Sequence, residues 1–140
     1  MPHSTMIFDL DGTLSDPALG VVCCTNFALT SFDLPPRADH EITRHICPPF
    51  DHTLALFSGS DDEEHTAALA ARYRERYAEF GFQENTLYPG VRETLAALKR
   101  RGSRLGVCTS KLRHYAIKIL EMFDLIPFFD FISGPTATET

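Results

Sequence analysis

The sequence predicts an α/β fold built on a parallel sheet, with a block of helices inserted after the first strand. Over residues 104–133 a strand, a helix and a second strand follow one another, which is typical of parallel strands joined by helical crossovers. The first predicted strand (5–9) lies about ninety residues before the strand at 104–110, whereas a crossover needs only about a dozen residues and a helix. We therefore predict an α/β core formed by residues 1–15 and 85–140, and a helical cap formed by residues 16–84.

Composition and net charge indicate a protein with a hydrophobic core and argue against some classes of partner. With 140 residues, 44% of them apolar and eleven of them Phe, the chain can bury a hydrophobic core. Thirteen basic and nineteen acidic residues give a net charge of −6 without a long basic run, which argues against a nucleic acid polymer or an anionic membrane as partner. No signal peptide and no membrane-spanning run is recognisable, so a cytoplasmic protein is expected.

The predicted core has three strands and two helices. Residues 5–9 form an apolar run, expected to be a buried strand, and residues 104–110 and 129–133 are the other two strands. An amphipathic helix over 90–101 ends in basic residues and Gly102. A second helix, between the later strands, has an apolar face formed by Leu112, Ala116, Ile119 and Phe123.

The predicted cap contains only helices. Asp16 and Pro17 begin a helix that runs to about Phe32, and short helices follow near Ile42 and Leu54. A long helix begins with a capping box, Ser60 with Glu63, and ends before the loop "QENTLYPG" at 83–90. Its apolar face consists of Leu69, Tyr73, Tyr77 and Phe80. We expect this cap to act as a lid with hinges near Ser15 and 83–89, because closure would exclude water from the site.

The cysteines and histidines do not predict a zinc site. Cys23, Cys24, Cys47 and Cys108 form neither a CxxC pair nor a dense framework, so reduced and mostly buried thiols are expected. The histidines of "HEITRH" are five residues apart, whereas the zinc-binding HExxH pattern requires four.

Polar residues follow the first two core strands. In "MIFDLDGTLSD" Asp9 and Asp11 are two residues apart and share a side of an extended chain, and Thr109 and Ser110 end the next strand. Ligands of parallel sheets bind at the carboxyl ends of the strands, where these residues would meet. One carboxylate could form an aspartyl phosphate, a second could transfer protons, and hydroxyl and amide groups could hold phosphoryl oxygens beside Mg²⁺.

The motifs resemble those of the haloacid dehalogenase-like (HAD) phosphatases. "DLDGTLSD" is similar to their first motif and "VCTSK" to their second, and the insertion resembles the helical C1 cap of the phosphoglycolate phosphatase and 5′-nucleotidase-like branch. The resemblance implies a Rossmannoid core and a Mg²⁺-dependent phosphatase acting on a small phosphorylated metabolite. It implies that Asp9 is the nucleophile and a magnesium ligand, and that Asp11 is the acid/base and also faces the metal. Thr109 and the Ser110 amide would bind the phosphoryl group.

Three alternatives remain open at this stage. Thr109 and Ser110 could instead cap the following helix, and Lys111 is either a motif lysine or a surface lysine. The family continues to a phosphate-holding lysine and to further acids, whereas this sequence stops at "GPTATET", so the core is expected to be incomplete, with one bare sheet edge. A shortened phosphatase is one interpretation, and a catalytically impaired module that binds a phosphate compound or a protein is the other. The open edge predicts self-association or complementation by another segment.

Overall fold

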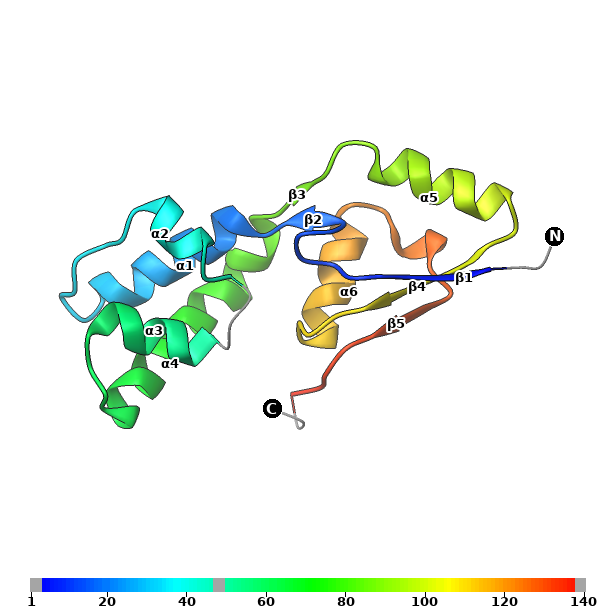
Figure 1. Cartoon of the computed structure of the whole chain (residues 1–140). Helices are drawn as coiled ribbons and strands as arrows, with labels where there is room; N and C mark the ends of the chain where they lie inside the picture. The colour runs from blue at the N-terminus through cyan, green and yellow to red at the C-terminus, as the bar shows by residue number, and fades with distance from the viewer. Residues whose placement is uncertain (1–3, 47–49, 138–140) are drawn as a thin grey trace. The chain divides into compact units, whose positions relative to one another are not determined.

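The computed structural model describes residues 4–46 and 50–137, and the chain within it forms two compact units (Figure 1). The first unit contains the residues up to Pro17 and those from Asn85 onward, and the second is Ala18–Glu84. Strands occur only in the first unit, whereas the described residues of the second are helical or irregular. None of the helices in the described part of the chain is long and apolar enough to cross a bilayer.

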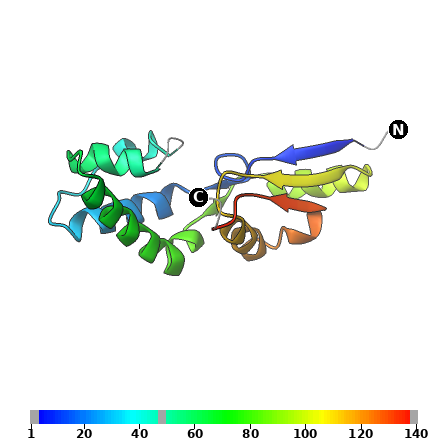
Figure 2. The same cartoon turned by 90° about the horizontal axis from the view of Figure 1, so that it is seen from below.

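The first unit is an α/β sandwich of one sheet and its crossover helices. Strands β1 (Thr5–Phe8), β4 (Arg104–Cys108) and β5 (Phe131–Ser133) lie side by side in the order β1-β4-β5, and both pairs are parallel (Figure 2). Helix α5 (Val91–Arg100) connects β1 to β4 after the inserted unit. Helix α6 (Arg113–Met122) and the short 3-10 helix η2 (Ile126–Phe128) connect β4 to β5. The predicted α/β class with a parallel sheet is confirmed.

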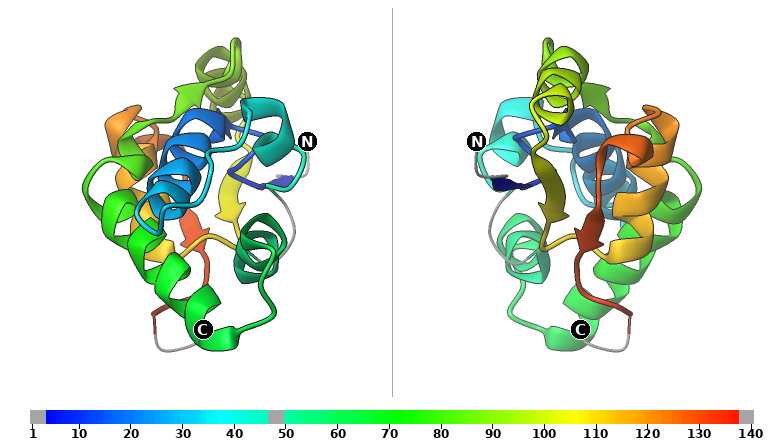
Figure 3. Two further views of the ribbon diagram at one scale, coloured as in Figure 1. Left: turned by 90° about the vertical axis from the view of Figure 1, so that its left-hand side faces the viewer. Right: turned by 90° about the vertical axis from the view of Figure 1, so that its right-hand side faces the viewer.

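Both crossover helices lie on one side of the three strands (Figure 3). The crossovers from β1 to β4 and from β4 to β5 progress in the same direction, so right-handed connections place α5 and α6 on the same face. On that face Leu105 and Val107 of β4 are completely buried, whereas Arg104 and Cys108, which point to the opposite face, are exposed. No helix of the described first unit covers the opposite face.

The expectation that the first strand is buried is wrong. Ile7 is 61% exposed and Met6 is 37% exposed. Within the described residues β1 pairs with β4 alone, and Ile7 lies in register with Gly106 on the face without helices. The sequence shows an apolar run but cannot show how many neighbours cover it. Cys108 on this face is likewise exposed, against the expectation of buried thiols; Cys24 is buried, Cys23 half-buried, and Cys47 lies outside the described residues.

Gly106 marks a close approach on this open face. Its neighbour in β5 is Phe131, and a Cβ atom at Gly106 would lie 2.0 Å from the Phe131 ring. The Arg104 guanidinium lies 5.7 Å from the centroid of the same ring. The aromatic ring therefore occupies the space above Gly106, and a larger residue at this position of β4 would require the Phe131 ring to move.

The second unit is a small helical bundle. Its helices are α1 (Ala18–Thr30), α2 (Asp39–Thr43), α3 (Phe50–Ser58), α4 (Glu63–Glu79) and the 3-10 helix η1 (Gly81–Gln83). Leu29, Leu54 and Leu69 are fully buried in its core. Helix α1 and η1 approach so closely that a Cβ atom at Gly20 would lie 2.4 Å from the Gly81 carbonyl oxygen.

Helix α4 begins differently from the prediction. Asp62 is its N-cap, and the Asp62 carboxylate accepts a hydrogen bond from the Glu64 amide at 3.0 Å. The hydroxyl of Ser60 accepts from the Asp62 amide instead, so the predicted Ser60–Glu63 capping box is wrong. On the predicted apolar face Leu69 and Tyr77 are buried, whereas Phe80, at the end of the helix, is 50% exposed.

A two-stranded ribbon joins the first unit to the inserted one. Strand β2 (Ser15–Asp16) pairs antiparallel with β3 (Thr86–Leu87). The Ser15 side chain is fully buried and its hydroxyl donates to the side-chain oxygen Oδ1 of Asn85 at 3.3 Å. The sequence predicts only a loop at residues 83–90, because a strand of two residues has no detectable periodicity.

Candidate active site

The four predicted site residues come from two adjacent strand ends. Phe8, the last residue of β1, is in register with Val107, and because the strands are parallel both chains leave the sheet at the same edge. Asp9 and Asp11 follow β1, and Thr109 and Ser110 follow β4. The structure thus places these four residues at the carboxyl edge of the sheet, where ligands of open α/β sheets bind.

A tight turn presents the two carboxylates. The buried Leu10 carbonyl accepts hydrogen bonds from the amides of Thr13, Leu14 and Ser15 at 2.9–3.2 Å. Gly12 has φ +80°, a conformation that favours glycine, and its amide donates to the Ser15 carbonyl at 2.8 Å. Asp9 is exposed, and its Oδ1 accepts from the Leu10 amide at 2.7 Å. The Asp9 carboxylate is therefore oriented by the backbone and accessible from solvent.

Asp11 is paired with a lysine. Lys111 Nζ lies 3.1 Å from Asp11 Oδ2, and the Lys111 side chain is only 11% exposed. Asp11 Oδ1 is buried and has no hydrogen-bond partner among the described residues. Burial raises the pKa of the Asp11 carboxyl, the neighbouring Lys111 opposes that rise, and the Asp9 charge adds to it. Of the two interpretations left open for Lys111, the surface lysine is wrong, and no pattern in the sequence indicates this ion pair.

The turn after β4 is held firmly. The Thr109 amide donates to the Ser133 carbonyl at 3.0 Å, and the buried Thr109 hydroxyl oxygen accepts from the Lys111 amide at 3.1 Å. A Cβ atom at Gly134 would lie 2.8 Å from the Lys111 carbonyl oxygen, so the chain leaving β5 packs directly against this turn. Ser110 is exposed at its tip.

The hydroxyl groups of Thr109 and Ser110 do not cap α6. Leu112 is the N-cap residue of that helix and makes no side-chain capping hydrogen bond. The alternative that this polar pair is present only to begin the helix is therefore not what the structure shows. Their side chains and amides remain at the sheet edge, beside Lys111.

The donors at this edge fit one hard cation. Mg²⁺ commonly binds one or two protein carboxylates and completes its coordination with water and phosphate oxygens. Asp9 and Asp11 lie close enough for the Asp9 charge to raise the pKa of Asp11, and Asp11 Oδ1 is an unpartnered carboxylate oxygen. Residues 4–46 and 50–137 contain no group of three or more His, Cys, Asp or Glu that could hold a metal by itself. Water and substrate oxygens could complete a metal site that begins with Asp9 and Asp11.

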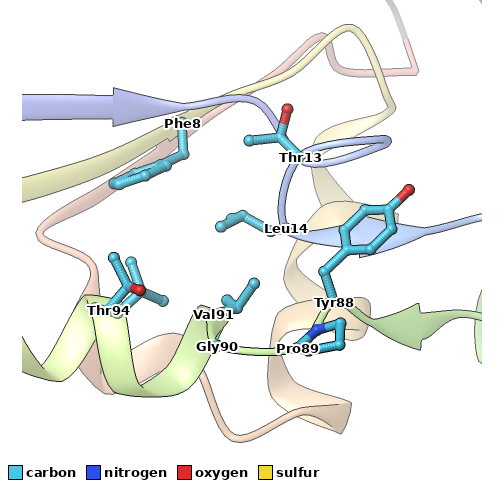
Figure 4. Close-up of a pocket in the computed structure, with 9 residues that line it drawn as sticks. Phe8, Thr13, Leu14, Tyr88, Pro89, Gly90, Val91 and Thr94 are labelled. Atoms are coloured by element: carbon cyan, nitrogen blue, oxygen red, sulfur yellow. The ribbon is translucent and has the colours of Figure 1, made fainter.

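An apolar pocket lies on the helix-covered face, beneath the carboxylate turn (Figure 4). It has a volume of about 240 Å³ and is lined by Phe8, Leu14, Tyr88, Val91, Leu95 and four other residues of β1, the turn and the start of α5. Neither the two aspartates nor the residues 109–111 line it. The pocket is thus separate from the polar site, and no pattern in the sequence predicts it.

Comparison with known proteins identifies the family of this site. A sequence profile described as haloacid dehalogenase-like hydrolase matches residues 6–140. The chain is 38% identical to tyrosine-protein kinase PtkA of Mycobacterium tuberculosis, over 92% of this chain and 43% of PtkA. It is 33% identical to the phosphoglycolate phosphatase of Caulobacter vibrioides, over 94% of this chain and 57% of that protein. The chain thus spans about half the length of these curated relatives.

Known structures agree with this assignment. A crystal structure of a candidate phosphatase from Clostridium difficile superposes with a TM-score of 0.91 and 31% sequence identity. That alignment covers all of this chain and 64% of the clostridial protein. The profile match extends over almost the whole sequence and includes the Asp9 turn and the turn at 109–111. The chain belongs to the haloacid dehalogenase-like hydrolases.

Proposed function

We propose that the first unit is the catalytic core of a Mg²⁺-dependent phosphatase that hydrolyses a small phosphomonoester. The observation that supports this proposal most is the placement of Asp9 and Asp11 at the same sheet edge as the turn at 109–111. This edge combines an accessible carboxylate, a second carboxylate, a cation and hydroxyl and amide groups. Phosphoryl transfer depends mainly on positioning and charge stabilisation, which such a set can supply.

Asp9 would act as the nucleophile. Its exposed carboxylate attacks phosphorus, the bond to the ester oxygen breaks, and an aspartyl phosphate forms. Asp11 would donate a proton to the departing alkoxide and then accept one from the water that hydrolyses the aspartyl phosphate, which releases phosphate and restores Asp9. Thr109 and the Ser110 amide would bind phosphoryl oxygens. A Mg²⁺ ion bound by Asp9 and Asp11 would neutralise part of the negative charge of the phosphoryl group.

The proposed substrate is a small phosphorylated metabolite. The similarity to a phosphoglycolate phosphatase favours a phosphoglycolate-like ester, and the motif likeness to 5′-nucleotidase-like phosphatases keeps a nucleotide as the other candidate. We also propose that the helical unit Ala18–Glu84 acts as a cap that excludes water during the reaction. Its insertion directly after the carboxylate turn supports this role.

A second candidate function is a binding module without turnover. The described residues contribute two carboxylates to the proposed metal site, and one face of their sheet is uncovered. Such a chain would bind a phosphate compound or a protein. The two candidates differ in whether Asp9 can be phosphorylated.

Beryllofluoride, which mimics the phosphoryl group of an aspartyl phosphate, tests the proposal without requiring turnover. We expect Mg²⁺-dependent bound ¹⁹F resonances with the unsubstituted chain, and none with Asp9→Asn. Hydrolysis of an aryl phosphate should fall at least about a thousandfold in Asp9→Asn, as expected when an enzyme loses its nucleophile. Asp39→Asn, on the exposed start of α2, is the matched control and should behave as the parent.

Three results would contradict the proposal. They are hydrolysis by Asp9→Asn at the parental rate, hydrolysis that survives excess chelator, and bound beryllofluoride that does not depend on Asp9. Incubation with labelled ATP and a tyrosine peptide should be run in parallel, because the mycobacterial relative is named a tyrosine kinase. Transfer of label to the peptide would assign the phosphoryl acceptor differently.

A further inference from the structure

We infer that the apolar pocket beneath the carboxylate turn binds a small, neutral molecule built on one or two aromatic rings, and that the bound molecule stabilises the turn. The pocket has a volume of about 240 Å³ and lies between β1, the turn and the start of α5 (Figure 4). Neither Asp9 nor Asp11 lines it. The inference therefore does not depend on the proposed phosphatase function.

The walls of the pocket favour an uncharged ligand. None of the nine described residues that line it has a charged side chain, and its polar side-chain groups are the hydroxyls of Thr13, Tyr88 and Thr94. Burying a charge beside such residues without an ionic partner is costly, whereas a neutral apolar molecule gains free energy by leaving water. A phosphate ester or a carboxylate is therefore a poor ligand for this pocket.

The volume of the pocket limits the size of the ligand. An apolar cavity of about 150 Å³ can hold one benzene molecule, and pockets for drug-sized molecules measure roughly 300 to 1,000 Å³. At about 240 Å³ this pocket lies between the two. A single aromatic ring or a fused pair of rings fits these limits, whereas a nucleotide does not.

Backbone hydrogen bonds hold the walls of the pocket in place. The Tyr88 amide donates to the Leu14 carbonyl at 3.2 Å, which joins the segment before α5 to the turn, and the Thr94 amide donates to the Gly90 carbonyl at 3.0 Å. Leu14 and Leu95 are almost completely buried, whereas Gly90 and Thr94 are exposed and leave the pocket accessible from solvent. A ligand would therefore enter a formed pocket with little rearrangement.

The carboxylate turn itself forms one wall of the pocket. Phe8, which lines the pocket, directly precedes Asp9. Thr13 and Leu14 also line it, and their amides donate to the Leu10 carbonyl within the turn at 3.1 and 2.9 Å. A molecule packed against these side chains has to leave before the turn can open, so its binding stabilises the turn.

Titration of the full chain with indole, followed through the methyl resonances of labelled Leu and Val residues, tests the binding. We expect saturable shifts of the resonances of Leu14, Val91 and Leu95. Toluene should also bind. Benzoate, in which a carboxylate replaces the methyl group of toluene, should bind at least about tenfold more weakly than toluene, because its charge would lose hydration in the pocket.

Substitutions that fill the pocket locate the site. Val91→Phe places a ring in the pocket and should abolish saturable indole binding. Thr94→Phe fills the pocket from an exposed position on α5 and serves the same purpose if Val91→Phe folds poorly. Leu19→Phe adds the same ring at an exposed position of α1, outside the pocket, and should bind indole as the parent does.

Hydrogen exchange measures the effect of binding on the turn. At an indole concentration of ten times the Kd, exchange of the Thr13, Leu14 and Ser15 amides should slow about tenfold. The reason is that opening which requires an empty pocket is suppressed by one plus the ratio of the ligand concentration to the Kd. In Val91→Phe, indole should leave these exchange rates unchanged.

Three results would overturn the inference. They are no saturable shift up to the solubility limit of indole, indole binding that both filling substitutions leave unchanged, and unchanged exchange of the turn amides in a chain saturated with indole. An affinity for indole that falls as the chain concentration rises would also overturn it, because a second copy of the chain would then occupy the pocket. The Asp9-dependent beryllofluoride signal is measured without indole and tests the proposed function separately.

Discussion

The two carboxylate oxygens of Asp11 have different surroundings. One carboxylate oxygen contacts Lys111 and the other is buried without a partner among the described residues. Asp11→Asn keeps the shape of the side chain and removes its ability to transfer a proton. We expect aryl phosphate hydrolysis to fall about a hundredfold or more, which is the usual contribution of general acid–base catalysis.

The Asp11→Asn substitution should also cause the phosphorylated form of the chain to accumulate. Because Asp11 would activate the water that cleaves the aspartyl phosphate, a phosphorylated chain is expected to persist after rapid acid quenching. Intact-protein mass spectrometry should detect it in Asp11→Asn and not in the double variant that also carries Asp9→Asn. Hydrolysis at the parental rate by Asp11→Asn would move the proton-transfer role to another residue.

At the residue scale, the sequence predicts positions better than contacts. The sequence predicts where the strands end, and parallel strands have their carboxyl ends at one edge of the sheet. The common location of Asp9, Asp11, Thr109 and Ser110 could therefore be predicted. The contact of Lys111 could not be predicted, since it depends on the path of the turn after β4 and on the packing of Gly134 against it. The chemical roles of these residues stay predictions until the variants are measured.

At the scale of secondary-structure elements, hydrogen bonds of Asp130 connect a helix and two strands. Its Oδ2 accepts hydrogen bonds from the Leu105 amide of β4 at 2.8 Å and from Lys99 Nζ of α5 at 3.1 Å. Asp130 itself immediately precedes β5, and its amide donates to the Leu105 carbonyl at 2.7 Å. The Leu105 amide, and after it Lys99, lowers the pKa of the Asp130 carboxyl below its usual value of 3.8.

This lowered pKa has a definite consequence for stability against pH. The charged carboxylate favours the folded state, so its contribution is fully present above pH 3.8 and is lost as the pH falls through the lower pKa of the folded state. Asp130→Asn should therefore lower the melting temperature at pH 7, and its difference from the parent should shrink in strong acid. Asp61→Asn, in an exposed loop, is the control. A difference that grows toward low pH would show that the sign is wrong.

Local sequence patterns predict the longer helices, but they do not predict the two-residue strands or the exact start of a helix. Helix α5 has an apolar face, a basic last turn and Gly102 after its end, and each signal is local in the sequence. The ribbon of β2 and β3 depends on a pairing between residues that are about seventy positions apart, which no short-range pattern reveals. The predicted start of α4 is wrong because Ser60 and Asp62 are both good caps, and the local hydrogen bonds favour Asp62.

At the scale of the whole molecule, the uncovered face of the sheet should affect association. Parallel sheets are normally covered on both faces, whereas here Ile7 is 61% exposed on a strand whose outer edge has no strand partner among the described residues. We propose that the chain self-associates through β1. Ile7→Lys places a charge on this strand and should shift the concentration-dependent species toward monomer in sedimentation velocity.

The control for this experiment is Leu19→Lys. Leu19 is similarly exposed, at 58%, but lies on α1 in the helical unit. Equal effects of the two substitutions would point to general solubility rather than to the strand edge. A monomeric parent at all concentrations would reject self-association through β1.

The α/β class could be predicted because it depends on the order of elements along the chain, and this order is visible in the sequence. The burial of β1 could not, because it depends on how many strands and helices surround it. An apolar run of the same composition is compatible with a central strand and with an exposed edge. Ile7 and Val107 illustrate the difference, since both are aliphatic β-branched residues in adjacent strands and only Val107 is completely buried.

The pairing of β2 with β3 determines how freely the inserted helices can be altered. The polypeptide leaves the α/β unit after Ser15–Asp16 and returns at Thr86–Leu87, and these two segments are hydrogen-bonded neighbours. The two ends of the inserted segment are thus as close together as the two strands of a β-hairpin. The helices between them could be lengthened, shortened, exchanged for another fold or replaced by a tight turn, and the pairing of β1, β4 and β5 would be left intact.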